Sequence, residues 1–164
     1  MVSLTPRPPA WTDTAPVKVA AARELWATPD EVFEALADHE SWPDWFDGVT
    51  RVERLGHQHG GVGSRRRVII GGRGRVDEEF NVWEPGTAWG FTGTDMSPPL
   101  LRSLNERVTI QPIGPDRVRV TYLMAIDPRP VVGLVVKVAT KGIAKNLAAA
   151  LESLGRRLEA QRAG

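Results

Sequence analysis

The chain has 164 residues, a net charge of +1 at neutral pH and no cysteine. A chain of this length fits one domain that can bury a core without disulfides or metal ions. The small net charge argues against a general nucleic-acid-binding protein, because such proteins carry a strong basic surplus. The lack of cysteine excludes disulfides and cysteine-based zinc or redox sites.

Residues 1–16 are rich in proline, threonine and alanine. This composition predicts a flexible N-terminal segment, followed by a single domain over residues 17–162. No apolar run follows Arg7 as in a secretory signal, and no window holds the roughly 18 uncharged apolar residues that a transmembrane helix needs. We therefore expect a cytoplasmic protein without an integral membrane segment.

The first predicted elements are a strand and two short helices. Alternating residues over 18–27 predict the strand. Thr28 is a suitable N-cap and Pro29 suits the first position of a helix that ends near Asp38. The stretch "HESWPDWFDGV" predicts a second, shorter helix rich in aromatic side chains.

The middle of the chain predicts a meander of six antiparallel strands. Alternating runs are separated by turn signals such as Glu84-Pro85-Gly86 and Gly114-Pro115, and no helical pattern lies between them. A long amphipathic helix is predicted over about 130–160. One apolar stripe follows helical spacing: Val132, Val136, Ile143, Leu147, Ala150, Leu154 and Leu158.

The long helix has two unusual features. Lys137, Lys141 and Lys145 lie on the face opposite the apolar stripe. The first turns are apolar nearly all round, so they are either covered on two sides or offered to a partner, a membrane surface or a second subunit. One helix covers a curved antiparallel sheet incompletely, so we expect a cavity between helix and sheet, closed at one end by the short helices.

In this order of elements the chain resembles the START/SRPBCC superfamily, and within it the bacterial polyketide cyclase/dehydrase and lipid transport group. Three segments carry the resemblance, which spans about residues 18–160: "ATPDEVFEALADHESWPDWFDGV", "VDEEFNVWEPGTAWGF" and "NERVTIQPIGPDRVRVTY". It implies an α+β helix-grip fold, in which a curved seven-stranded antiparallel sheet wraps around the C-terminal helix and leaves a deep apolar cavity. It does not fix a function, because members include carriers, cyclases and aromatases.

Two acids and one phenol lie on otherwise apolar strand faces: Glu78, Glu106 and Tyr122. If they face a cavity, desolvation raises the pKa values of the two carboxyls and makes these groups candidates for proton transfer or for hydrogen bonding to a ligand. The alternative is that either acid pairs with an arginine such as Arg66 or Arg75, or lies at a sheet edge in water.

Further ligand contacts are expected from the short helix, the inner strand faces and the long helix: Trp42, Trp45, Phe46, Phe80, Trp89, Phe91, Met124, Ile143 and Leu147. Ordinary core packing is the alternative for the tryptophans. His57 and His59 have no carboxylate at ligand spacing, so neither a metal site nor a cofactor is predicted. The arginine run 65–67 is expected on the exterior of the sheet.

Three functions fit these patterns. The first is binding or transport of a hydrophobic small molecule, such as a lipid, a polyketide or an isoprenoid-like compound. The second is a polyketide cyclase or aromatase, in which Glu78, Glu106 and Tyr122 are the acid/base candidates; no other catalytic residue is assigned. The third is an interaction module that uses the apolar start of the long helix. No nucleic-acid partner is expected, and a monomer and a homodimer both remain open.

Overall fold

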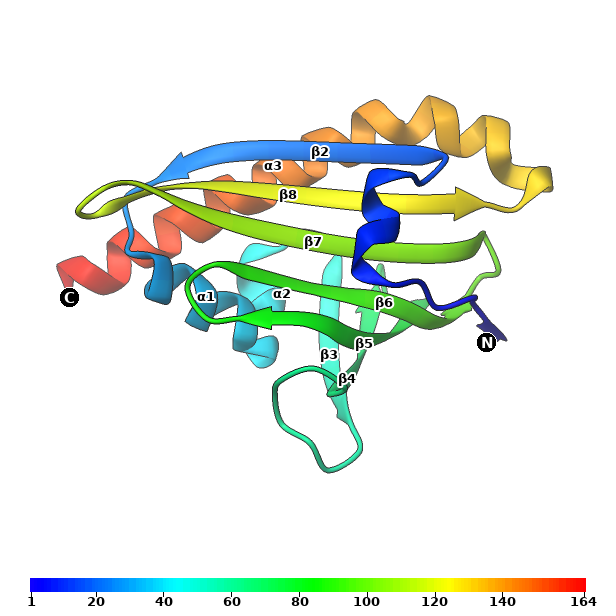
Figure 1. Cartoon of the computed structure of the whole chain (residues 1–164), viewed down its shortest axis with the longest axis horizontal. Coiled ribbons are helices and arrows are strands. Elements are labelled where there is room, and N and C mark those ends of the chain that lie inside the picture. Colours follow the sequence, from blue (N-terminus) through cyan, green and yellow to red (C-terminus); the bar gives the residue numbers. More distant parts are fainter.

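The computed structural model describes residues 1–164, apart from the side chain of Lys137 (Figure 1). The elements follow this order along the chain: β1 (Val2–Ser3), η1 (Pro9–Asp13), β2 (Val17–Leu25), α1 (Pro29–Ala37), η2 (His39–Ser41), α2 (Trp42–Trp45), β3 (Val49–Leu55), β4 (Arg65–Ile70), β5 (Gly74–Glu84), β6 (Ala88–Ser97), β7 (Leu101–Gly114), β8 (Arg117–Pro128), η3 (Pro130–Val132) and α3 (Gly133–Ala163). No helix in this described part of the chain is long and apolar enough to cross a membrane.

The strands form one antiparallel sheet in the order β2-β8-β7-β6-β5-β4-β3, and the two-residue β1 adds an eighth strand by pairing with β6. Figure 1 shows α1, α2 and α3 on one side of the sheet and η1 on the other. We call the side that carries the three α-helices the inner face. The predicted α+β architecture, with its meander, two short helices and long C-terminal helix, is confirmed.

A capping box begins α1 at the residues that the sequence indicated. The Thr28 hydroxyl accepts a hydrogen bond from the Glu31 amide at 3.3 Å, and the Glu31 carboxylate accepts one from the Thr28 amide at 2.6 Å. This reciprocal pair fixes the turn from β2 into the helix. Trp42 then ties α2 to α1, because its indole N–H donates to the Leu36 carbonyl at 3.0 Å. The two short helices therefore hold the tryptophan segment over the inner face.

Strand alternation places the predicted polar residues on the inner face. Glu106 pairs in register with Met124 and with Phe91, and Glu78 pairs with Arg66. Since residues that are paired across neighbouring strands point to the same side, these side chains share one face. All of them except Met124 are buried, and Met124 is half-buried.

A β-bulge in β5 interrupts the alternation that the sequence suggests. The register shifts between Phe80 and Val82, so Val82 lies opposite Gly90 and the next residue, Trp83, lies opposite Trp89. The extra residue reverses the side to which the following side chains point. Trp83 consequently joins the inner face, where its ring lies 5.1 Å from that of Phe80.

The apolar stripe of α3 packs onto the inner face along the second half of the helix. Its buried members are Leu147, Ala150, Leu154 and Leu158, and the adjacent Leu151 is buried with them. Gly155 allows close approach to β2, because a Cβ at this position would lie 2.9 Å from Leu25 Cδ2. A solvent-exposed ion pair of 2.8 Å between Arg23 on β2 and Glu152 on α3 links the same strand and helix.

The first residues of the chain pack against the outer face of the sheet, whereas the sequence predicts a flexible segment. We call residues 2–15 the N-terminal strap. Asn105 Nδ2 donates to the carbonyls of Arg7 and Pro8, both at 3.1 Å, and the Arg7 side chain donates to Ser103 at 3.0 Å. The strap therefore covers polar side chains of the outer face, whereas Leu4 is buried beside Gly93 as part of the hydrophobic core.

Replacing Leu4 with alanine is expected to lower the free energy of unfolding by about 2–3 kcal/mol, because the side chain is 5% exposed and its removal leaves a cavity in the hydrophobic core. Val2→Ala is the matched control, since Val2 is 37% exposed, and it should cost under about 0.5 kcal/mol. Urea denaturation of both variants gives the comparison. Equal stabilities for Leu4→Ala and the unmodified protein would show that the strap does not stay on the sheet.

Candidate functional site

An aromatic cluster lies where α2 meets the inner face. The Trp42 ring lies 4.7 Å from Trp45, 5.6 Å from Phe46 and 5.3 Å from Trp89, measured between centroids. Phe80 continues the cluster, with its ring 5.1 Å from Trp89. The sequence predicts these aromatic residues as ligand contacts, and the structure brings them together with Phe91, 5.5 Å from Trp89.

A buried ion pair lies within this aromatic cluster. Arg66 Nε donates to Glu78 Oε2 at 2.6 Å, and the two side chains are 1% and 6% exposed. The Arg66 guanidinium carbon lies 4.0 Å from the centroid of the Trp42 ring and 5.0 Å from that of Trp89. Such distances allow cation–π attraction on several sides of the guanidinium.

The inward position of Arg66 corrects the expectation that the arginine run lies on the sheet exterior, and its ion pair bears out the alternative that Glu78 pairs with an arginine such as Arg66. Alternation sends Arg66 inward, opposite Glu78, while Arg65 is exposed and Arg67 bonds to Asp77 at 2.6 Å on the other face. Arg66, which the sequence suggested only as an ion-pair partner, is thus an additional candidate residue of the site. Its position opposite an inward acid on the next strand was the available signal.

Glu106 and Tyr122 form a second buried polar pair. They lie on the neighbouring strands β7 and β8, and the Tyr122 hydroxyl donates to Glu106 Oε2. The Tyr122 ring also contacts Phe46 at 6.0 Å between centroids, which connects this pair to the aromatic cluster. The structure therefore brings the three predicted polar residues, Glu78, Glu106 and Tyr122, to one side of the sheet together with Arg66.

Burial shifts the acid–base behaviour of this group. It raises the pKa of Glu106 to about 8, helped by the negative charge of Glu78 and partly offset by the Tyr122 hydrogen bond. Burial also raises the pKa of Glu78, against the opposing effect of Arg66. The pKa of Tyr122 lies well above its ordinary value, because burial and the nearby Glu106 both disfavour the phenolate. At neutral pH, Glu106 is therefore mainly protonated.

Several buried polar atoms around the cluster lack a hydrogen-bond partner. These atoms are Arg66 Nη1, the indole nitrogens of Trp45 and Trp89, and His39 Nε2. A buried donor without a partner costs free energy, so such atoms are rare in folded proteins. Three of the four are N–H donors.

His39 is held as a neutral base beside the cluster. Its ring stacks on Phe80 at 5.0 Å, and burial, reinforced by the charge of Arg66, lowers its pKa to about 3. No group of three or more histidine, cysteine, aspartate or glutamate side chains within the described residues could hold a metal ion.

The remaining predicted contacts lie at different depths. Leu147 is buried in the core under α3. Phe46, Met124 and Ile143 are half-buried and pack against the edge of that core.

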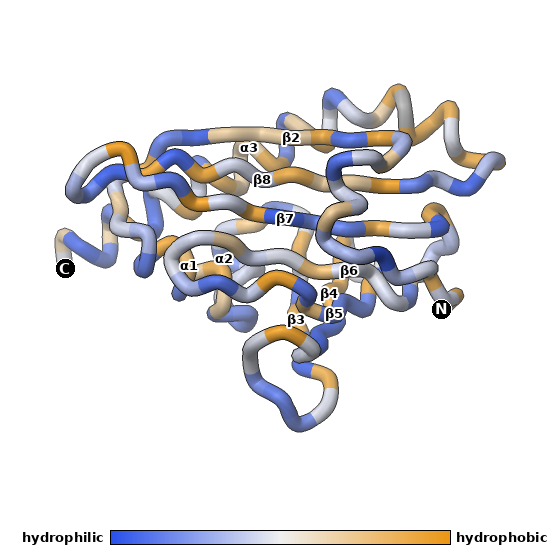
Figure 2. The backbone as a smooth tube through the Cα atoms, viewed as in Figure 1, coloured by the Kyte–Doolittle hydropathy of each residue, from blue (hydrophilic) through white to orange (hydrophobic). Residues whose placement is uncertain are grey.

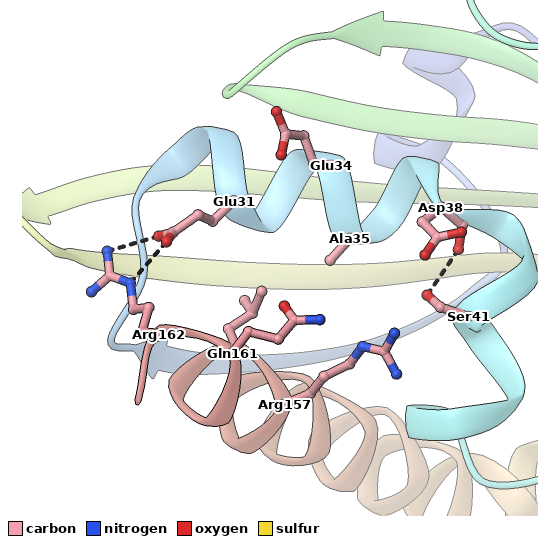
Figure 3. A pocket seen from close by; sticks show the side chains of 9 residues that line it. Glu31, Glu34, Ala35, Asp38, Ser41, Arg157, Gln161 and Arg162 are labelled. Atoms are coloured by element: carbon pink, nitrogen blue, oxygen red, sulfur yellow. Dashed lines mark hydrogen bonds and ion pairs between the residues drawn. The ribbon is translucent and has the colours of Figure 1, made fainter. Parts of the chain in front are cut away.

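Two surface pockets lie elsewhere on the molecule. One, of about 420 Å³, lies between α1 and the C-terminal end of α3, and Arg157 and Gln161 are among the residues that line it (Figure 3). An ion pair of 2.7 Å between Glu31 and Arg162 closes one end of it (Figure 3). The other, of about 400 Å³, lies next to Pro9 on the outer face. Neither is lined by the aromatic cluster or by the buried polar residues, so neither is the apolar cavity that the sequence predicts between the long helix and the sheet.

Solved structures share this fold. A START superfamily protein from Mycobacterium smegmatis superposes with a TM-score of 0.73 at 21% identity, over 86% of this chain and 98% of that one. The Zhui aromatase/cyclase from Streptomyces sp. R1128 has a TM-score of 0.69 at 16% identity, over 87% and 95% of the two chains. A norcoclaurine synthase from Thalictrum flavum has a TM-score of 0.68 at 17% identity and covers 99% of both.

Sequence comparisons give the family. An uncharacterized protein from Mycobacterium tuberculosis is 34% identical over 116 residues, which make up 71% of this chain and 69% of the relative. The profile of the family described as polyketide cyclase / dehydrase and lipid transport matches residues 16–159, and so leaves the whole N-terminal strap outside. The chain belongs to the polyketide cyclase/dehydrase and lipid transport family.

Proposed function

We propose that the protein binds an apolar small molecule with a carbonyl or carboxylate group, of the lipid, polyketide or isoprenoid-like class, between the inner face and α3. The observation that carries this proposal is the buried Arg66 guanidinium, which lies among aromatic rings and has an unpartnered Nη1. Replacing a buried ion pair with apolar residues is often neutral or stabilising, so its presence in a core favours a functional role.

The balance of donors and acceptors indicates the polar part of the ligand. Arg66 Nη1 and the indole N–H groups of Trp45 and Trp89 are donors without acceptors. Glu106 adds a further proton, because its pKa of about 8 keeps it protonated at neutral pH. A ligand oxygen that accepts hydrogen bonds would satisfy this surplus of donors, and the surrounding rings would contact its apolar body.

The half-buried apolar residues at the edge of the core suggest the route of entry. Phe46 directly after α2, Met124 on β8, and Val136 and Ile143 on α3 are all partly exposed and pack against the core. We place the entry between these three elements, where a ligand would move side chains without breaking a strand pair. Both described pockets lie away from this route, so binding would involve separation of α3 from the sheet.

Displacement of a bound apolar fluorescent dye tests the proposal. A long-chain fatty acid and a polycyclic aromatic ketone are compared with hydrocarbons of equal size. Because a hydrogen bond to a charged group contributes about 1.5–3 kcal/mol, the oxygen-bearing ligands should bind at least about tenfold more tightly. In Arg66→Lys this preference should fall, whereas the exposed neighbour variant Arg65→Lys should retain it. Absence of displacement by any of the four compounds would refute the proposal.

Glu106 supports a second candidate function, that of a polyketide cyclase or aromatase. A carboxylic acid with a pKa of about 8, hydrogen-bonded to a tyrosine, can deliver or accept a proton near neutral pH. Glu106→Gln and Tyr122→Phe separate the two functions. An enzyme would lose about 10²–10⁴-fold in rate on a poly-β-keto substrate, whereas a carrier would keep most of its affinity.

A further inference from the structure

The short helix η3 and the beginning of α3 expose large apolar side chains to solvent. Val131, Leu134, Val135 and Val138 are 94%, 77%, 67% and 76% exposed, more than any other large apolar side chain within the described residues. Figure 2 shows the same hydrophobic turns where α3 begins, at the end of the molecule that also holds the N-terminus. A patch of this kind on a helix indicates a contact surface.

The exposed face of α3 changes from apolar to basic along the helix. Leu134, Val138, Lys141 and Lys145 follow one another in steps of four, three and four residues, so they form one stripe. Both lysines are exposed, while Ile143 points to the core side and is half-buried. The stripe is therefore an outward surface that does not belong to the proposed ligand site.

The charged residues just before and within the first half of α3 are all basic. Residues 128–151 contain no aspartate or glutamate and four basic residues: Arg129, Lys137, Lys141 and Lys145. The first acidic residue after this segment is Glu152, and it forms an ion pair with Arg23. A second copy of this chain on the patch would place these positive charges against an identical set, and like charges facing each other are unfavourable.

We propose that the exposed first half of α3 docks on the surface of an anionic lipid bilayer. The apolar turns would enter the boundary between headgroups and acyl chains, and the lysines would lie at the level of the negative headgroups. Leu100 enlarges the apolar tip, since its carbonyl accepts the Arg129 amide at 3.0 Å and its side chain is 41% exposed. Docking of this kind is reversible, because a single short amphipathic segment binds weakly.

Flotation with vesicles of phosphatidylcholine alone, and with vesicles that also contain phosphatidylglycerol, tests this proposal. We expect the full chain to float only with the anionic vesicles and to be released at high salt. Each lysine near an anionic surface strengthens binding about fivefold, so Lys141→Gln/Lys145→Gln should bind about 25-fold more weakly. Leu134→Ser/Val138→Ser should also lose binding.

Three controls make the result specific. Arg156→Gln removes an exposed charge from the same helix beyond Glu152, and Val62→Ser removes a 62% exposed apolar side chain elsewhere; both should bind as the unmodified protein does. Glu106→Gln alters the ligand site and should leave flotation unchanged, which separates docking from the proposed function. Equal flotation with both vesicle types, or a concentration-dependent dimer in solution that Leu134→Ser/Val138→Ser abolishes, would overturn the proposal.

Discussion

Replacing Arg66 with methionine is expected to lower the free energy of unfolding by about 3–5 kcal/mol, the largest single effect that we predict. The substitution keeps apolar volume beside Trp42 but leaves the Glu78 carboxylate buried without its cation, at 6% side-chain exposure. An unpaired buried charge is far more costly than the pair itself is stabilising. Urea denaturation at neutral pH measures the difference.

The double variant Arg66→Met/Glu78→Leu separates loss of the pair from loss of packing. Removing both charges should recover most of the stability that Arg66→Met loses, since no unpaired charge remains. Arg65→Met is the matched control on the adjacent residue, because its ion pair with Glu79 is exposed and should contribute at most about 1 kcal/mol. An Arg66→Met protein as stable as Arg65→Met would contradict the buried ion pair.

Stability is expected to fall by about 1–1.5 kcal/mol between pH 6.5 and 8, and Glu106→Gln is expected to remove most of this fall. In the folded protein, burial raises the pKa of Glu106 from 4.5 to about 8, so the carboxyl keeps a proton that the unfolded chain releases. Because the folded state then binds more protons, the free energy of unfolding decreases as pH rises. The raised pKa of Glu78 acts in the same direction.

The titration of His39 sets pH 6.5 as the lower end of the pH range used in this test. Burial lowers its pKa from 6.5 to about 3, so below pH 6.5 the unfolded chain binds a proton that the folded protein does not. Stability from His39 therefore rises with pH up to about 6.5 and opposes Glu106 in that range. Denaturation at half-unit steps from pH 6.5 to 8 isolates the carboxyl. A flat profile for the unmodified protein, or the same slope in Glu106→Gln, would place the Glu106 pKa near its ordinary value.

Local signals in the sequence predicted the elements that position the site. The capping box of Thr28 and Glu31 marked the start of α1, and period-two alternation placed Glu106 and Tyr122 on one face. Helical spacing of apolar residues identified the stripe of α3 that packs on the sheet. These features depend on neighbouring residues or on one strand pair, so sequence alone contains them.

Features that depend on distant contacts could not be predicted in the same way. The bulge at Phe80 and Val82 reverses the side of Trp83, and nothing in the alternation of β5 marks the extra residue. The strap's backbone carbonyls at Arg7 and Pro8 accept hydrogen bonds from Asn105, on a strand nearly a hundred residues later. Partners this far apart in sequence are fixed only by the completed sheet.

The most direct test of the central claim is identification of small molecules that copurify with the protein, by native mass spectrometry followed by extraction. The arrangement of Arg66, Glu106 and the unpartnered indole N–H groups predicts an apolar molecule with a carbonyl or carboxylate oxygen, retained by the unmodified protein and weakly held by Arg66→Lys. A protein that is empty as purified and takes up none of the oxygen-bearing compounds when they are added would contradict the account.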